Sequence, residues 1–163
     1  MLIFAFQMEI TDNQQRQKKI EAWIKQLRKR KDADDLFQEA HYEVFAKTNC
    51  LSCANCCKTT GPLITETDID RISAKLKLKA LDFIKLYLIK DPDDGQWMMN
   101  TLPCPFLLPD NFCSIYEFRP KACREFPHTD RKRINQILKL TAKNAEICPA
   151  VDEIWTEVGK QLK

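Results

Sequence analysis

The sequence predicts a small, mostly α-helical single domain with irregular segments rich in proline and cysteine, and at most one short β-hairpin. Apolar residues recur at helical spacing in several stretches, only 3 glycines are present, and prolines interrupt the chain repeatedly after Trp97. A chain of 163 residues has the size of one ordinary domain. We therefore expect one domain over residues 1–163, with N-terminal helices at 1–45, a cysteine-cluster core at 46–150 and a C-terminal helix at 151–163.

Two helices are predicted before the cysteines. In residues 11–31, apolar side chains fall on one helical face: Ile20, Trp23, Ile24 and Leu27. Residues 33–46 form the second helix, with acidic residues at its start and an apolar side made of Phe37, His41, Val44 and Phe45. We expect His41 at the edge of the core rather than as a ligand. The apolar start, residues 1–6, is expected to be a short strand or a buried tail, unless the natural chain begins at Met8.

Helices and turns also follow the first cysteines. Thr65 is a plausible N-cap of a helix whose buried stripe is Ile69, Ile72 and Leu76. A further short helix is expected over 81–89, and a turn over 91–95.

The proline-rich part predicts short strands at 97–99 and 112–116. A helical region is expected over 131–143. The last helix should begin near Pro149, which suits the first helical turn, and its stripe is Val151, Ile154, Trp155 and Val158.

The charges give little support to a nucleic-acid or membrane protein. No apolar run approaches the roughly 18 residues of a membrane helix, and no signal peptide is recognisable, so we expect a cytoplasmic protein. The first helix has a basic face of Arg16, Lys18, Lys19, Lys25, Arg28, Lys29, Arg30 and Lys31. This face is either a solvated surface or a contact for an acidic partner or nucleic acid, and the lack of interleaved aromatic residues favours the solvated surface.

The cysteines carry the strongest functional signal. The chain has 8 cysteines: Cys50, Cys53, Cys56, Cys57, Cys104, Cys113, Cys123 and Cys148. Thiols at this spacing form disulfides, bind a soft metal or exchange redox equivalents. Because cytosolic thiols stay reduced, we favour a metal, zinc or iron, with an iron–sulfur cluster as one form of iron.

The number of metal centres is left open at one or two. Adjacent residues point about 100° apart on a helix, so the pair Cys56–Cys57 favours two centres or a bridged centre. The alternative is that one or two cysteines, Cys57 or Cys148 above all, are ordinary buried side chains.

The pattern Cys-x2-Cys-x2-Cys-Cys at 50–57 resembles the signature of the zinc- or iron-chelating cysteine-cluster proteins, often called the YkgJ family. Segments 65–72, 104–107, 113–116 and 119–127 resemble the rest of that family's pattern, over roughly residues 46–150. Ala54-Asn55 departs from it, because members often carry glycine first. The resemblance implies metal chelation by the eight cysteines.

Distantly similar flagellin lysine methylases imply an iron–sulfur cluster and group transfer to protein lysines. Because this chain is shorter than those enzymes, that activity is not carried over.

Four side chains are candidates to lie next to the ligands: Arg119, Arg124, His128 and Tyr116. Guanidinium groups can donate to thiolate sulfur, and an aromatic ring can exclude water. Three functions follow: a metal-chelating protein, which we favour; an iron–sulfur enzyme in redox or group transfer; and a module that binds nucleic acid or a partner through the basic helix. Whether the protein is an enzyme stays open.

Overall fold

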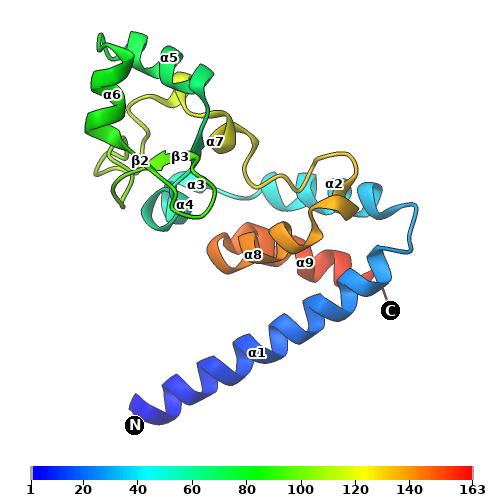
Figure 1. Ribbon diagram of the computed structural model, residues 1–163. Coiled ribbons are helices and arrows are strands. Elements are labelled where there is room, and N and C mark those ends of the chain that lie inside the picture. Colours follow the sequence, from blue (N-terminus) through cyan, green and yellow to red (C-terminus); the bar gives the residue numbers. More distant parts are fainter. Residues whose placement is uncertain (1, 163) are drawn as a thin grey trace. The chain divides into compact units, whose positions relative to one another are not determined.

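The computed structural model describes residues 2–162, and their side chains from residue 14 onward. The described chain is mostly helical with one small sheet, which confirms the predicted fold class (Figure 1). Its contacts divide it into two compact units. Unit 1 comprises Met1–Thr48 and Pro127–Lys163, and unit 2 comprises Asn49–Phe126. That the whole chain behaves as one domain stays a prediction.

Unit 1 is built from helices that come from both ends of the chain. They are α1 (Leu2–Leu27), α2 (Ala33–Phe45), the 3-10 helix η2 (Ile134–Gln136), α8 (Leu138–Ile147) and α9 (Pro149–Lys160). The strand considered for residues 1–6 is wrong from Leu2 onward, because α1 begins there; Met1 lies outside the described residues. Whether this start is buried also falls on side chains outside the description.

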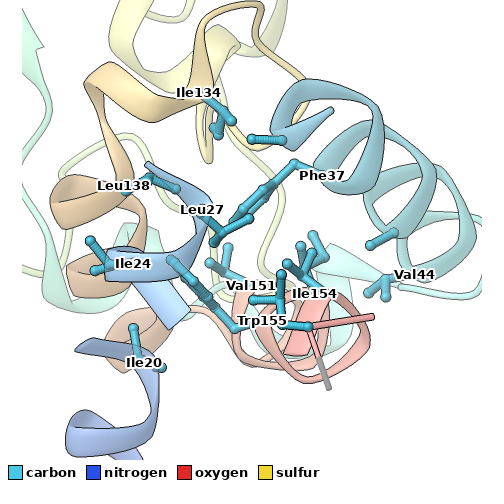
Figure 2. Close-up of a cluster of buried hydrophobic side chains, with 14 of the residues drawn as sticks. Ile20, Ile24, Leu27, Phe37, Val44, Ile134, Leu138, Val151, Ile154 and Trp155 are labelled. Atoms are coloured by element: carbon cyan, nitrogen blue, oxygen red, sulfur yellow. The ribbon is translucent and has the colours of Figure 1, made fainter. Parts of the chain in front are cut away.

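The core of unit 1 is centred on Trp155, which has no exposed surface. The ring of Phe37 meets it edge-on at 5.1 Å between centroids, and Trp23 stacks on it at 6.5 Å. Figure 2 shows side chains of α1, α2, α8 and α9 gathered around the rings of Phe37 and Trp155. Aromatic pairs of this kind add about 0.5–1.5 kcal/mol each beyond burial of area. The predicted stripe of α9 is therefore confirmed as core.

The start of α8 differs from the predicted helix over 131–143. Arg133 has a left-handed backbone (φ 60°), which interrupts a helix at that point. The carboxylate of Asp34 accepts hydrogen bonds from Arg133 N at 2.7 Å and Ile134 N at 2.8 Å. These bonds satisfy the free N–H groups that begin η2, and α8 follows two residues later.

Unit 2 consists of short elements around a second core. They are α3 (Cys50–Cys53), α4 (Asn55–Thr59), β1 (Leu63–Ile64), α5 (Glu66–Lys75), α6 (Ala80–Tyr87), β2 (Leu88–Lys90), β3 (Trp97–Met99), the 3-10 helix η1 (Tyr116–Phe118) and α7 (Lys121–Glu125). Buried side chains such as Ile69, Ile72, Phe83 and Met99 form its core. Thr65 caps α5 as predicted, and α6 ends at Tyr87, before the expected Ile89, because the chain enters β2.

The sheet of unit 2 has the strand order β1-β3-β2, all antiparallel. β2 and β3 form the hairpin around the predicted turn at 91–95, with Leu88 opposite Met99. β1 adds a third strand. It has only two residues, which are too few to show the alternating pattern of a strand in the sequence. The strand expected over 112–116 is wrong: only Cys113 pairs, in a single bridge with Leu107, and η1 begins at Tyr116.

Candidate metal centre

The motif at 50–57 folds as two short helices joined at one residue. Asn49 caps α3 by accepting a hydrogen bond from Leu51 N at 3.1 Å. Ala54 then adopts a left-handed backbone (φ 49°, ψ 22°) that ends α3 and begins α4. Cys50 and Cys53 therefore belong to one helical turn, and Cys56 and Cys57 to the next. This conformation costs an alanine about 1–2 kcal/mol, a cost that glycine would avoid.

Cys56 and Cys57 are close neighbours on α4. Their sulfur atoms lie 4.0 Å apart, within the range of a thiol hydrogen bond. Two thiolates on one tetrahedral zinc, each at about 2.3 Å from the ion, lie about 3.8 Å apart. The pair thus has nearly the spacing of two ligands of one ion, and its adjacency is no longer a reason to assign it to two centres.

Backbone hydrogen bonds bring the later cysteines of unit 2 to this pair. Cys104 N donates to Cys57 O at 2.8 Å, which fixes residues 103–113, here called the proline-rich arm, against α4. The bridge between Leu107 and Cys113, with Ser114 N donating to Phe106 O at 2.9 Å, folds Cys113 back along the same arm. Cys123 lies on α7.

The thiols act on one another electrostatically. Burial, followed by the charges of Cys104, Cys113 and Cys56, raises the pKa of Cys123 to about 12. Burial also raises the pKa of Cys104. The hydrogen bond between Cys56 and Cys57 raises the pKa of Cys56 and lowers that of Cys57. Burial and neighbouring thiols thus oppose ionisation of Cys56, Cys104 and Cys123, and a positive charge nearby would offset this effect.

The sulfurs are neighbours, but they do not enclose an ion as they are placed. Among the described residues, no group of three or more His, Cys, Asp or Glu side chains has the geometry of a formed metal site. Cys50 is exposed and Cys53 half-buried on α3. Cys148 belongs to unit 1, where it packs against the hydrophobic core at the start of α9. Its role as an eighth ligand stays a prediction.

The charge of Arg119 lowers the pKa of Cys123, although burial and neighbouring thiols raise it more strongly. The Nε of Arg119 is buried and has no hydrogen-bond partner among the described residues. A buried N–H donor without a partner costs about 1–3 kcal/mol, and a thiolate sulfur within reach would be an acceptor that removes this cost. The donor set and this arginine therefore fit a metal–thiolate centre.

The other predicted neighbours have different surroundings. Arg124 Nη1 donates to Arg119 O at 2.7 Å. The Tyr116 ring lies 3.8 Å from the Arg119 guanidinium but is 52% exposed, so it supports the arginine more than it excludes water. His128, with a left-handed backbone (φ 66°), belongs to unit 1.

Sequence reasoning missed one buried carboxylate near this site. Asp68 is 2% exposed, and hydrogen bonds from Thr65, Arg71 and Lys121 N lower its pKa although burial opposes ionisation. Part of this network could be predicted from the sequence. Asp68 lies three positions after the N-cap Thr65, and Arg71 follows three positions later. The bond of Asp68 to Lys121 joins positions 53 residues apart, which no local pattern reveals.

The basic face of α1 is partly used by unit 1 itself. The Arg16 guanidinium forms an ion pair with Asp152 at 2.6 Å and lies over the Trp23 ring at 5.7 Å. Arg30 binds Asp32 through two hydrogen bonds. Within the described part of the chain, no helix combines the length and apolar character needed to cross a membrane.

Comparison with known proteins identifies the cysteine region. Residues 49–149 match the family model CxxCxxCC, described as "Putative zinc- or iron-chelating domain". The match covers more than half of the 163 residues and includes all 8 cysteines. Searches of curated proteins and of solved structures returned no match.

Proposed function

Because the chain belongs to the CxxCxxCC family, we propose that it is a metal-chelating protein that holds zinc or iron through the cysteines of unit 2. The observation that carries this proposal is the 4.0 Å distance between the Cys56 and Cys57 sulfurs, together with the bond from Cys104 N to Cys57 O at 2.8 Å. The bridge at Cys113 folds a further thiol back along the same segment as Cys104, and the charges of Cys104 and Cys113 act on Cys123. Thiols gathered from separate segments suit a shared soft metal, because the thiolate is the form of cysteine that binds zinc and iron.

The residues that would hold the metal follow from this placement. Cys56 and Cys57 supply a pair from α4, Cys104 and Cys113 a second pair from the proline-rich arm, and Cys123 one thiol from α7. Cys50 and Cys53 stand on the preceding helical turn and extend the set. A bound divalent cation would offset the repulsion among the thiolates and connect the three segments.

The spacing of Cys56 and Cys57 favours a single ion bound by both. In a four-iron cluster, each cysteine binds a different iron, so two adjacent ligands at nearly contact distance suit a mononuclear thiolate site or a two-iron cluster better. Eight cysteines would still allow two centres.

Metal analysis of the full chain tests the proposal. Protein purified without oxygen is measured by elemental analysis and by its absorption spectrum, and its thiols are titrated before and after metal removal. We expect about one or two zinc or iron ions per chain, and thiols that become reactive when the metal leaves. Absorption near about 400 nm would indicate an iron–sulfur cluster. A metal-free protein whose thiols all react at once would contradict the proposal.

A further inference from the structure

The buried carboxylate of Asp68 is shared between two helices of unit 2. Its Oδ2 accepts hydrogen bonds from the Thr65 hydroxyl at 2.7 Å and from Thr65 N at 3.2 Å, which completes the capping box of α5. Its Oδ1 accepts from Arg71 Nη2 at 2.6 Å and from Lys121 N at 3.1 Å. The second oxygen is thus not needed to cap α5, and it points to another element.

Lys121 is the first residue of α7, and its N–H is one of the free donors that begin this helix. The N-cap position of α7 is held by Pro120, whose side chain has no hydrogen-bonding atom. Asp68 therefore supplies, from α5, the acceptor that an N-cap side chain normally provides. A helix of five residues is too short to be stable alone, so α7 depends on tertiary contacts such as this one.

A second connection holds the same segment. The Nη2 that donates to Asp68 also donates from Arg71 to Arg119 O at 3.0 Å. Arg124 Nη1 donates to this carbonyl at 2.7 Å from the other side. Arg119 and Lys121, both before Cys123, are thereby bonded to side chains of α5, through an ion pair that is nearly buried on its Asp68 side.

We propose that Asp68 is a positioning residue for the metal centre: through Lys121 N and Arg71 it holds α7 so that Cys123 faces the thiols of α4 and the proline-rich arm. The proposal rests on the proposed metal-binding function. It assigns a role in ligand geometry to a carboxylate that would not itself touch the metal. Outer groups that orient metal ligands typically change metal affinity by about 10- to 100-fold when they are removed.

Zinc binding by matched variants of the full chain tests this role. Asp68→Ala removes both oxygens, Asp68→Asn keeps one acceptor for Lys121 N but loses the charge, and Thr65→Ala breaks only the α5 side of the network. Zinc affinity is measured by competition with a chromophoric chelator, cobalt(II) absorption reports the number of thiolate ligands, and urea midpoints of the metal-free proteins report stability. Hydrogen exchange at residues 121–125 reports α7 directly.

We expect Asp68→Ala to weaken zinc binding about 10- to 100-fold, with fewer thiolates on cobalt(II) and faster exchange in α7. The zinc affinity of Asp68→Asn should lie between those of Asp68→Ala and the wild type. This variant keeps the test valid should Asp68→Ala fail to fold. Thr65→Ala should lower the urea midpoint while zinc affinity stays within about twofold.

Two results would overturn the inference. One is wild-type zinc affinity in both Asp68 variants; the other is an equal loss of affinity in Thr65→Ala, which would make Asp68 a stabilising residue only. A wild-type protein that binds neither zinc nor iron is a different result. It would refute the proposed function, and the positioning role with it.

Discussion

The sulfur atoms of Cys56 and Cys57 lie 4.0 Å apart on one helical turn. The side chains of adjacent residues diverge on a helix, but a cysteine thiol can rotate about its Cα–Cβ bond, and here the rotation brings both sulfurs to the same side. The resulting distance is close to the roughly 3.8 Å between two thiolates on one tetrahedral zinc.

Serine substitutions at this pair distinguish one centre from two. If both thiols bind one ion, Cys56→Ser, Cys57→Ser and the double variant should each lose the same equivalent of metal, because either loss opens the same site. The measurement is metal content after gel filtration in weak chelator. Ser52→Ala, on α3 within the same motif, is the matched control and should keep its metal. A double variant that loses twice as much metal as either single variant would show two centres.

Glycine at position 54 should stabilise unit 2. Ala54 has φ 49°, and relief of its left-handed strain exceeds the backbone entropy that glycine adds. We expect Ala54→Gly to raise the free energy of unfolding of the metal-free protein by about 0.5–1 kcal/mol, measured in urea. Ala74→Gly, near the end of α5, is the control and should lower it by a similar amount. Equal destabilisation by both changes would mean that the turn at Ala54 is not formed in solution.

Where local chemistry and one buried face agree, the sequence predicts the structure well. Val151, Ile154 and Trp155 recur at helical spacing behind Pro149, and all three are fully buried on α9. The start of α5 follows from Thr65 and an acidic residue three positions later, which form the predicted cap. In both cases, residues within one or two turns of each other supply the whole signal.

The candidate site is harder to predict because its parts come together through distant contacts. The list of cysteines follows from composition, but Cys104 reaches the motif through a backbone bond to Cys57 O, and backbone groups carry no sequence signal. The contact of Asp68 with Lys121 N is of the same kind. His128 and Cys148 follow the cysteine motifs in sequence, yet they belong to unit 1. Closeness along the chain was therefore a poor guide to which side chains share a unit.

Removal of the metal should affect unit 2 more than unit 1. The core around Trp155 supports unit 1 without any cysteine motif, whereas unit 2 consists of short helices and two- or three-residue strands. Hydrogen exchange with and without chelator should show lost protection in residues 49–126 and little change in α2 and α9. Chelator saturated with zinc is the control. Equal loss of protection throughout both units would show that the metal supports the entire fold.

Acid should destabilise unit 1 through His41. Burial lowers the pKa of His41, only partly opposed by Asp130, and its Nδ1 lies 2.7 Å from the Thr129 hydroxyl. Because the folded pKa is below the unfolded value of about 6.5, the unfolded chain binds more protons in that window, and stability falls as pH drops through it. Urea unfolding at pH 7.5 and 5.5 should show that His41→Gln loses less free energy of unfolding between these two pH values than the wild type does.

The other histidine, His128, is retained in both proteins, so its contribution is common to the comparison. The titration of the His41 ring by NMR provides an independent check. A pKa at or above 6.5 would disprove the proposed origin of the acid sensitivity.

Gly159 should not tolerate a side chain, because an added Cβ would overlap the ring of Trp23 at its Cζ2, Cη2 and Cε2 atoms. The ring cannot yield easily, since it stacks on Trp155 with an angle of 9° between planes. Gly159→Ala should therefore cost about 1–3 kcal/mol of unfolding free energy and change the tryptophan fluorescence of the folded protein. Gly61→Ala is the control: its Cβ would meet the flexible end of Met98 at 3.3 Å and Met99 O at an ordinary contact distance of 3.8 Å, and the cost should be smaller.

In a Trp23→Leu background the cost of Gly159→Ala should shrink, because the obstructing ring is gone. An unchanged cost in that background would mean that the helix itself, and not the contact with Trp23, requires glycine.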